Sequence, residues 1–349
     1  MEYLNGLIDL VQKEGASDLH LTEDKVPYIR LFGQLMPVSK YPKSTVTILK
    51  EILKDTMSDF GQKNFETRQS ADFSYSHGAE RFRVHTYVEQ RKICITFRHI
   101  RKKIPTLAEL NLPESLENFS RLRSGFLLVV GPTGHGKSTT LAALVEKINS
   151  ERLENIITIE DPVEYIFTPQ KSIIHQREVG IDTPDFASAL HDSFRADVNV
   201  IMVGEMRDSE TIATAVSAAE TGHLVFSTLH TNDVAQTVDR IIDAFPANQQ
   251  NQIRVQLAAS LSGILSQRLI PRISGGLIPA YELLINNTAV SNLIRDKRTH
   301  ELNTVIETSS QEGMLDFNRC LVNLVDKGEI TVENAYLYST NRKVLEKML

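Results

Sequence analysis

The stretch of sequence that decides the fold is Gly131-Pro132-Thr133-Gly134-His135-Gly136-Lys137-Ser138. It matches the pattern GxxxxGK[ST], a loop whose backbone N–H groups surround phosphate oxygens. The apolar run 126–130 precedes the loop, and apolar residues at helical spacing follow it at Leu141, Leu144, Val145 and Ile148. A strand, this loop and a helix in that order place a helix N-terminus against a bound anion.

Each residue type in the loop has a chemical role. The glycines let the backbone approach the phosphates, Lys137 offsets charge on the β and γ phosphates, and the Ser138 hydroxyl can bind Mg²⁺. His135 occupies a variable position, where it either touches phosphate or faces solvent, and we favour solvent. We expect ATP and Mg²⁺ as ligands. The predicted nucleotide contacts in the loop are Gly131, Pro132, Thr133, Gly134, His135, Gly136, Lys137, Ser138 and Thr139.

Short apolar runs separated by helical patterns follow the loop. We predict strands at 156–159, 198–203 and 224–228, and a helix at 210–219. Strands with little alternation, separated by helices, are typical of a parallel sheet buried on both faces, so the fold class is α/β. After Asp233 the pattern predicts mainly helix to the end of the chain, with apolar positions at Val255, Leu257, Leu261, Ile264 and Leu265.

The first hundred residues follow a different pattern. Helical spacing of Leu4, Leu7, Ile8 and Val11 predicts a first helix that ends at Gly15. Extended stretches at 28–32 and 71–75, and alternation at 81–85 and 93–97, predict strands. We therefore predict a small α+β domain at 1–98, a linker at 99–115 containing Arg101-Lys102-Lys103, and a second domain at 116–349.

An acidic residue follows the predicted strand 198–203. Glu205 stands at the carboxyl end of this strand, where open α/β sheets bind ligands. Gly204 replaces the Asp that usually precedes this Glu, so we expect Ser138 to hold Mg²⁺ and Glu205 to reach the ion through water. The alternative is a solvated turn.

A second acidic cluster follows the predicted strand 156–159 and contains Glu160 and Glu164. A carboxylate at this edge can orient or deprotonate the attacking water. We favour Glu160 over Glu205 for that role, and the sequence does not decide between them.

Two histidines bracket the strand predicted next. His223 precedes it and His230 follows it. A lone histidine at a strand end is more often structural, but the phosphate-binding loop favours a γ-phosphate sensor at His230. Asn232 and Asp233 are expected to cap the following helix.

Three arginines alternate with buried positions in the N-terminal region. Arg81 and Arg83 lie opposite the face of Phe82 and Val84, and Arg98 lies opposite the apolar face of its own strand. They form either a solvated sheet face or an arginine clamp that completes a nucleotide site from outside the loop domain.

Composition excludes several classes of protein. The 349 residues include 38 basic and 44 acidic residues, a formal net charge of −6, which argues against nucleic acid as a partner. The only cysteines, Cys94 and Cys320, cannot form a disulfide framework or a four-cysteine zinc site. Without a long apolar run or a secretory signal pattern, we expect a cytoplasmic chain that is not inserted in a membrane.

Five motifs in order resemble the type IV pilus retraction ATPases, the twitching-motility motors of the bacterial type II/IV secretion ATPase superfamily. The resemblance covers essentially the whole chain. The motifs are ASDLHL at 16–21, GPTGHGKSTT at 131–140, ITIEDPVEY at 157–165, VGEMRDSETI at 203–212 and TGHLVFSTLHTND at 221–233.

The resemblance implies a PAS-like N-terminal domain and a RecA-like ATPase core. It implies a homo-hexamer that is peripheral at the inner membrane, binds ATP at the junction between domains and subunits, and acts on an inner-membrane platform protein. The residues that match the catalytic motifs of the family are Glu160 and Glu164 in the Asp box, Glu205 in Walker B, and His223 and His230 in the His box. The arginines that match those reaching the phosphates are Arg81, Arg83 and Arg98.

This sequence departs from the family pattern at three places. His135 stands where the family usually has Ser, and Phe194-Arg195-Ala196-Asp197 replaces Leu-Arg-Gln-Asp. Ala289-Val290-Ser291-Asn292 replaces the Ala-Ile-Arg-Asn signature that is tied to retraction. Besides a main retraction motor, the alternatives are an accessory retraction motor, another secretion ATPase, or a nucleotide-gated scaffold without turnover.

Overall fold

The computed structural model describes residues 1–31, 34–78, 80–100 and 103–349. The chain divides into two compact units, and each is described by itself. The first unit contains Met1–Lys103, Glu160–Ile166 and Gln176–Asp185, and the second contains Ile104–Ile159, Phe167–His175 and Phe186–Leu349. Phe32, Arg101 and Lys102, which belong to the predicted strand and linker, lie outside the described residues. The domain limits predicted at 98 and 116 remain predictions.

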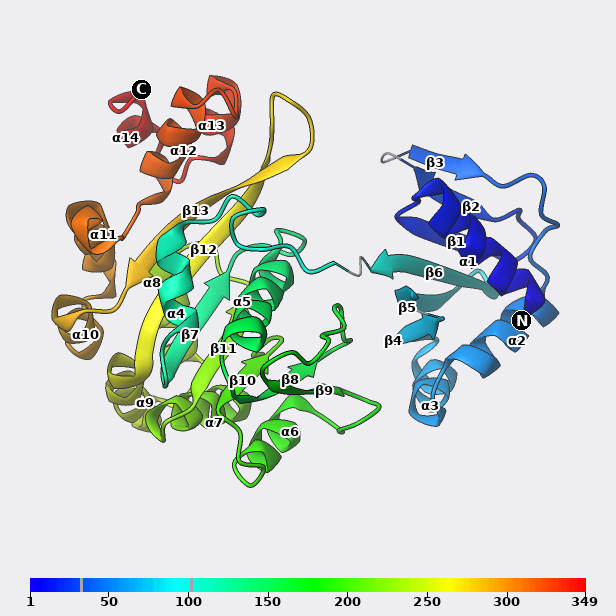
Figure 1. The fold of residues 1–349 in the computed structure, drawn as a ribbon, viewed down its shortest axis with the longest axis horizontal. Helices are drawn as coiled ribbons and strands as arrows, with labels where there is room; N and C mark the ends of the chain where they lie inside the picture. The colour runs from blue at the N-terminus through cyan, green and yellow to red at the C-terminus, as the bar shows by residue number, and fades with distance from the viewer. Residues whose placement is uncertain (32–33, 79, 101–102) are drawn as a thin grey trace. The chain divides into compact units, whose positions relative to one another are not determined.

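The first unit is built on a six-stranded sheet, in the order β3-β2-β1-β6-β5-β4 (Figure 1). Each neighbouring pair is antiparallel. The alternation predicted at 81–85 and 93–97 is confirmed, because Phe82 and Phe97 are fully buried while Arg98 is exposed. The strands are β1 Asp18–Thr22, β2 Tyr28–Leu31, β3 Gln34–Pro37, β4 Ser70–His77, β5 Glu80–Glu89 and β6 Lys92–Ile100.

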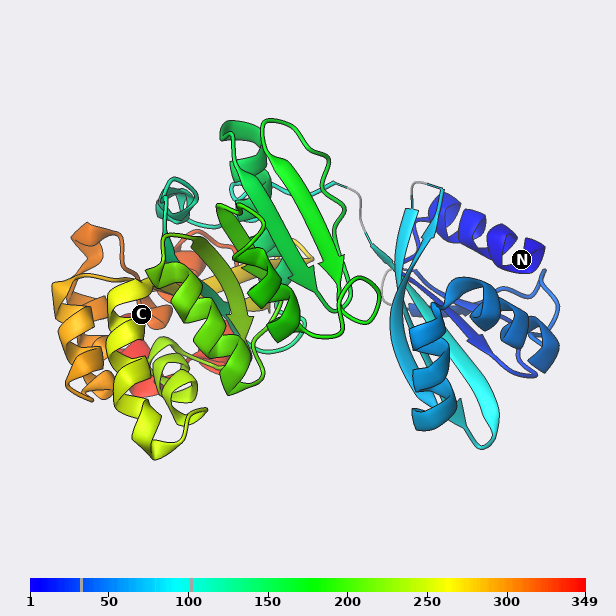
Figure 2. The same ribbon diagram turned by 90° about the horizontal axis from the view of Figure 1, so that it is seen from below.

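Helices cover this sheet and share its core (Figure 2). In α1 the predicted apolar stripe is fully buried, and Gly15 ends the helix in the left-handed region with φ 67. Side chains of Thr45 and Ser58 accept the N-terminal hydrogen bonds of the next two helices. The helices are α1 Glu2–Glu14, α2 Val46–Thr56 and α3 Asp59–Arg68.

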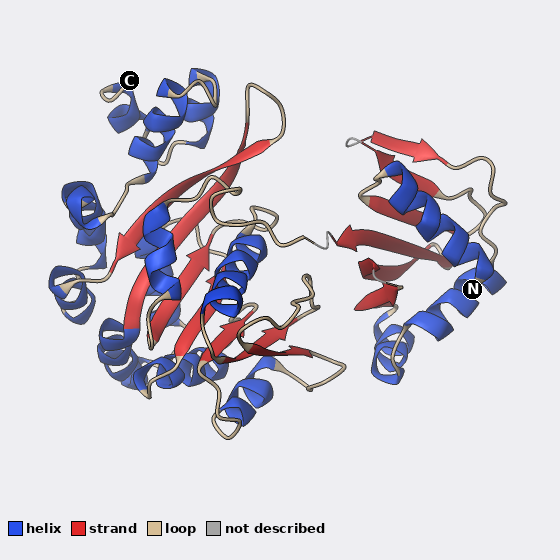
Figure 3. Cartoon of the chain, viewed as in Figure 1, coloured by secondary structure: helices blue, strands red, loops and turns tan. Residues whose placement is uncertain are grey.

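The second unit is built on a seven-stranded sheet, in the order β13-β12-β7-β11-β10-β8-β9 (strands red in Figure 3). The pairs β12–β7, β7–β11, β11–β10 and β10–β8 are parallel, as the sequence predicts for its central strands, and β12 pairs with β13 in the antiparallel direction. Every residue of β7 and β11 is buried, as expected for strands covered on both faces. The strands are β7 Gly125–Val130, β8 Asn155–Glu160, β9 Ile173–Glu178, β10 Val200–Val203, β11 Leu224–Leu229, β12 Leu261–Pro271 and β13 Leu277–Ile285.

The helices of the second unit connect these strands and extend beyond them. The predicted helix after the phosphate-binding loop is α5, and the helix predicted at 210–219 is α7. Asp233 caps α8 by accepting a hydrogen bond from Gln236 N, as predicted. The helices are η1 Glu114–Leu116, α4 Glu117–Ser120, α5 Lys137–Glu151, α6 Phe186–Ser193, α7 Ser209–Glu220, α8 Val234–Asp243, α9 Ala247–Ser260, α10 Thr288–Arg295, η2 Thr299–Glu301, α11 Leu302–Thr308, η3 Ser310–Glu312, α12 Phe317–Asp326, α13 Val332–Tyr338 and α14 Arg342–Glu346.

The prediction of mainly helix after Asp233 is wrong for residues 261–285. Val255 and Leu257 lie on α9, but Leu261, Ile264 and Leu265 lie on β12, which pairs with β7 and β13. Helical spacing continues from α9 into the strand by coincidence, and a short apolar run does not distinguish a buried strand from a buried helix. Pairing across the sheet decides the structure instead.

The last helices pack against β12 and β13 through a cluster of their own. Phe317, Leu321 and Leu345 share this core with Ile270 and Ile278. The Arg268 guanidinium lies over the Phe317 ring, 5.4 Å from its centroid, and donates to the Tyr338 carbonyl at 3.4 Å. The edge strand β13 and its neighbour β12 are therefore attached to the C-terminal helices.

Candidate active site

The loop between β7 and α5 has the backbone shape that phosphate binding needs. Gly134 and Gly136 both have φ 81, in the left-handed region that favours glycine. Such residues, alternating with right-handed ones, turn successive N–H groups toward one point. Gly131 is required for another reason, since a Cβ there would lie 2.3 Å from the Gln267 carbonyl oxygen.

Lys137 begins α5 and is buried against the loop. Its Nζ donates to the carbonyls of Gly131 at 2.8 Å and Pro132 at 2.9 Å. It also lies 3.4 Å from His230 Nδ1, and Thr133 Oγ1 lies 3.2 Å from the same nitrogen. The ammonium is therefore held inside the loop, beside the histidine that follows β11.

Glu205 joins this group from the end of β10. Its Oε1 forms an ion pair with Arg207, and its Oε2 lies 3.4 Å from His230 Nε2. Because an ammonium only donates, the Nδ1 of His230 accepts from Lys137, and Nε2–H faces Glu205. Lys137, His230 and Glu205 thus lie together at the carboxyl ends of β7, β11 and β10, where ligands of parallel sheets bind.

His223 lies elsewhere in the unit. It precedes β11 and His230 follows β11, so a six-residue strand, about 20 Å long, separates them. His223 Nδ1 lies 3.0 Å from the Ala218 carbonyl, and its ring meets Phe194 edge to face. The structure does not bring His223 to the phosphate-binding loop of its own chain, and its catalytic role remains a prediction.

Contacts between the loop and β12 involve residues that sequence analysis missed. Gln267 is buried, and its Nε2 donates to the His135 carbonyl at 2.7 Å while its Oε1 accepts from Thr140 at 2.8 Å. The Leu269 N–H donates to His135 Nδ1 at 2.8 Å, so the imidazole contacts a strand. The amide within the largely apolar stretch 261–270 is the signal that could have identified Gln267.

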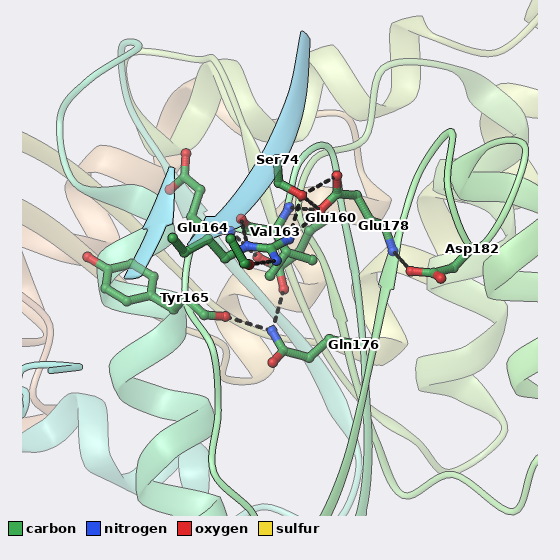
Figure 4. A network of polar contacts seen from close by, with 10 residues as sticks. Ser74, Glu160, Val163, Glu164, Tyr165, Gln176, Glu178 and Asp182 are labelled. Carbon is green, nitrogen blue, oxygen red and sulfur yellow. Dashed lines mark hydrogen bonds and ion pairs between the residues drawn. The ribbon is translucent and has the colours of Figure 1, made fainter. Parts of the chain in front are cut away.

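In the first unit, Glu160 and Glu164 form part of a polar network (Figure 4). Glu160 is buried; its Oε2 accepts from Glu164 N at 3.3 Å and its Oε1 from Gln176 Nε2 at 3.4 Å. Gln176 Nε2 also donates to the Tyr165 carbonyl at 2.7 Å. The carboxylate of Glu160 is therefore oriented by its neighbours, and its role toward water remains a prediction.

The three predicted arginines share one face of the first sheet. Arg83 pairs directly with Arg98 across β5 and β6, and Arg81 is two residues from Arg83. Arg81 Nη2 forms an ion pair with buried Glu178 Oε2 at 2.6 Å, and Arg83 Nη1 lies 3.4 Å from Glu164 Oε1.

Arg98 also has a carboxylate partner, because its Nε donates to Asp18 Oδ1 at 2.9 Å. Burial acts to raise the pKa of Asp18, but hydrogen bonds from Ser17 and Arg98 outweigh it and hold the pKa below its usual value. Each arginine is therefore paired within the first unit. Contact with phosphate remains a prediction for all three.

The described residues include no group of three His, Cys, Asp or Glu side chains that could hold a metal ion. Mg²⁺ bound to a nucleotide needs fewer protein ligands, and it prefers oxygen. Ser138 is exposed at the start of α5 and Glu205 follows β10, so the donor set, a hydroxyl and a carboxylate, fits this ion. No helix in the described part of the chain has both the length and the apolar character to cross a bilayer.

These features define a P-loop nucleotide-binding fold, and comparison with known proteins assigns its family. The family of type II/IV secretion system proteins matches residues 1–317, and the chain belongs to it. The sequence is 42% identical over 330 residues to the type IV pilus retraction ATPase PilT of Pseudomonas aeruginosa, covering 94% of this chain and 96% of that protein. It is 38% identical over 345 residues to the type IV pilus ATPase PilU of the same organism, covering 98% and 90%.

A solved structure agrees over the same length. The crystal structure of the pilus retraction motor PilT with bound ADP superposes with a TM-score of 0.91, at 42% identity, covering 99% of both chains. The relatives confirm the predicted family, the α/β fold class and the predicted enzyme class, a P-loop ATPase of the secretion superfamily.

Proposed function

We propose that this chain hydrolyses ATP at the loop 131–139 and that this hydrolysis powers type IV pilus retraction. The observation that carries the proposal is the group formed by Lys137, Thr133, His230 and Glu205 at the carboxyl ends of three parallel strands. The similarity to PilT, over nearly all of both chains, supports pilus retraction as the work that hydrolysis performs.

The residues of this group have distinct roles in the proposed reaction. The ammonium of Lys137 leaves its carbonyl partners and offsets charge on the β and γ phosphates. His230 lies beside that ammonium and senses the γ-phosphate. Ser138 and Glu205 would hold Mg²⁺, Glu205 through water, and the ion would offset charge that develops on the leaving phosphate oxygens.

Two carboxylates compete for the role of general base. Glu160→Gln should lower kcat and leave nucleotide affinity unchanged if Glu160 activates water. Glu205→Gln should instead raise the Mg²⁺ concentration needed for half-maximal turnover. The opposite pattern would exchange the two roles.

The proposed assembly follows the family resemblance. The chain forms a homo-hexamer at the cytoplasmic face of the inner membrane and acts on a platform protein there. In that ring Arg81, Arg83, Arg98, Glu164 and His223 complete the nucleotide site. Light scattering with Mg²⁺ and ATP tests the assembly, and a monomer under those conditions would contradict it.

Phosphate release is the experiment that tests hydrolysis. Lys137→Ala should abolish release, while Lys343→Ala, which removes an exposed lysine on α14, should leave it unchanged. Full turnover by Lys137→Ala would refute the site. A wild-type chain that binds ATP without turnover would be a nucleotide-gated scaffold.

A second candidate function is an accessory retraction motor. The 38% identity to PilU and the substituted Ala-Val-Ser-Asn segment favour it. Ser291 Oγ donates to the Ala258 carbonyl at 2.9 Å, so the position contacts α9 where the family signature has a long cation. Deleting the gene decides, because immotile and hyperpiliated cells indicate the main motor, and motile cells indicate an accessory one.

A further inference from the structure

His135 is attached to β12 at two points. Its carbonyl accepts from Gln267 Nε2 at 2.7 Å, and its Nδ1 accepts from the Leu269 N–H at 2.8 Å. Gln267 is 2% exposed and also accepts from Thr140 in the first turn of α5. One strand therefore holds both the middle of the phosphate-binding loop and the helix that follows it.

The carbonyl contact fixes the direction of a neighbouring N–H group. The His135 carbonyl and the Gly136 N–H belong to one planar trans peptide unit, so they point in opposite directions. Because Gln267 holds the carbonyl toward β12, the Gly136 N–H points away from β12. A preset N–H direction lowers the cost of ordering the loop when phosphate binds.

The imidazole contact fixes a tautomer. A backbone N–H only donates, so Nδ1 of His135 carries no proton and Nε2 carries it. This contact requires the neutral ring. Protonation would place an N–H against the Leu269 N–H and would break the contact.

We propose that His135 is a positioning residue, and that its paired contacts with Gln267 and Leu269 preset the phosphate-binding loop for nucleotide. The proposal rests on the proposed function, since it assigns nucleotide to this loop. His135 stands where the family usually has Ser. The shorter Ser side chain has no acceptor as far from its backbone as Nδ1 is in His135, so the proposal gives this substitution a role.

The contact makes nucleotide affinity depend on pH. Burial lowers the pKa of His135 below 6.5, and the charges of Lys137 and Arg268, which face the ring from α5 and β12, lower it further. The neutral ring is therefore the form present at pH 8. As pH falls through the lowered pKa of His135, protonation releases the ring from Leu269 and weakens nucleotide binding.

The test measures ADP affinity of the full-length chain by calorimetry at pH 8 and pH 5.5, with four variants. His135→Ser removes the acceptor, and His135→Asn replaces Nδ1 with an amide oxygen that does not titrate. Gln267→Leu removes the carbonyl contact. The matched control is Gln252→Leu, which changes an exposed glutamine on α9.

We expect His135→Ser and Gln267→Leu to weaken ADP binding about five- to tenfold at pH 8, the effect of one unsatisfied buried group. His135→Asn should stay within about twofold of wild type at pH 8 and should lose less affinity than wild type at pH 5.5. In phosphate release, the KM for ATP should rise more than kcat falls. Gln252→Leu should match wild type.

Three results would overturn the inference. The first is an ADP affinity of His135→Ser equal to that of wild type at both pH values. The second is an equal loss of ADP affinity between pH 8 and pH 5.5 in wild type and His135→Asn. The third is tighter ADP binding by wild type at pH 5.5 than at pH 8. None of these affects the proposed function while wild type binds ADP and Lys137→Ala does not. A wild type without ADP binding would instead refute the proposed function, and the role of His135 with it.

Discussion

Replacing Arg81 with Ala should destabilise the first unit far more than the same change at Arg83. Glu178 is 4% exposed, and its carboxylate accepts from Arg81 at 2.6 Å, from Ser74 at 2.6 Å and from Val163 N at 3.1 Å. Arg81→Ala leaves this charge buried without its cation. Removing one partner of such a pair costs about 3 kcal/mol or more in unfolding free energy.

The Arg83 pair provides the matched comparison. Arg83 is 39% exposed and lies 3.4 Å from Glu164, which is 30% exposed. Solvent screens a pair of this kind, so Arg83→Ala should cost less than about 1 kcal/mol. Both substitutions remove an arginine side chain from β5. The difference between their costs in unfolding free energy therefore measures the effect of burying the ion pair.

Urea unfolding, monitored by far-UV circular dichroism, measures both costs. Circular dichroism is used because the chain has no Trp whose fluorescence could report unfolding. A double variant, Arg81→Met with Glu178→Leu, removes both charges and should recover most of the loss. Equal midpoints for Arg81→Ala and Arg83→Ala would refute the reasoning. In that case the network of Figure 4 would not stabilise the unit.

Three further outcomes follow from the second unit. Gly131→Ala should abolish ADP binding in calorimetry, because the added Cβ would lie 2.3 Å from the Gln267 carbonyl and φ is 143. Burial raises the pKa of Glu282 from 4.5 to about 7, so the native chain holds a proton that the unfolded chain releases, and stability falls as pH rises between these values. Glu282→Gln keeps an acceptor for Val234 N and should therefore raise the free energy of unfolding at pH 8 by an amount on the order of 3 kcal/mol. A higher melting temperature at pH 8, with little change at pH 4, would show this. Chelating Mg²⁺ with EDTA should stop phosphate release, and excess Mg²⁺ should restore it.

Local patterns predicted the parts of the fold whose signals lie close together in sequence. The glycines at 131, 134 and 136 define the loop, and apolar spacing defines α1. Alternation in β5 and β6 placed Phe82 inside and Arg81 on the other face. Each of these patterns follows from backbone geometry within a few residues.

Contacts between distant segments could not be predicted in the same way. Gln267 and His135 are 132 positions apart, and only the pairing of β12 with β7 brings them together. The partner of Arg81 is Glu178, 97 positions away. The sequence identified this cation but not the carboxylate that would bind it.

Neighbouring side chains of β12 point to opposite faces, which gives this strand two attachments. Gln267 holds the nucleotide loop, and Arg268 rests on Phe317 in the C-terminal helices. A displacement of the strand moves both, without a hinge between them. A molecule that binds those helices and shifts β12 must therefore also change the affinity for ATP. By thermodynamic reciprocity, ATP changes the affinity for that molecule by the same factor.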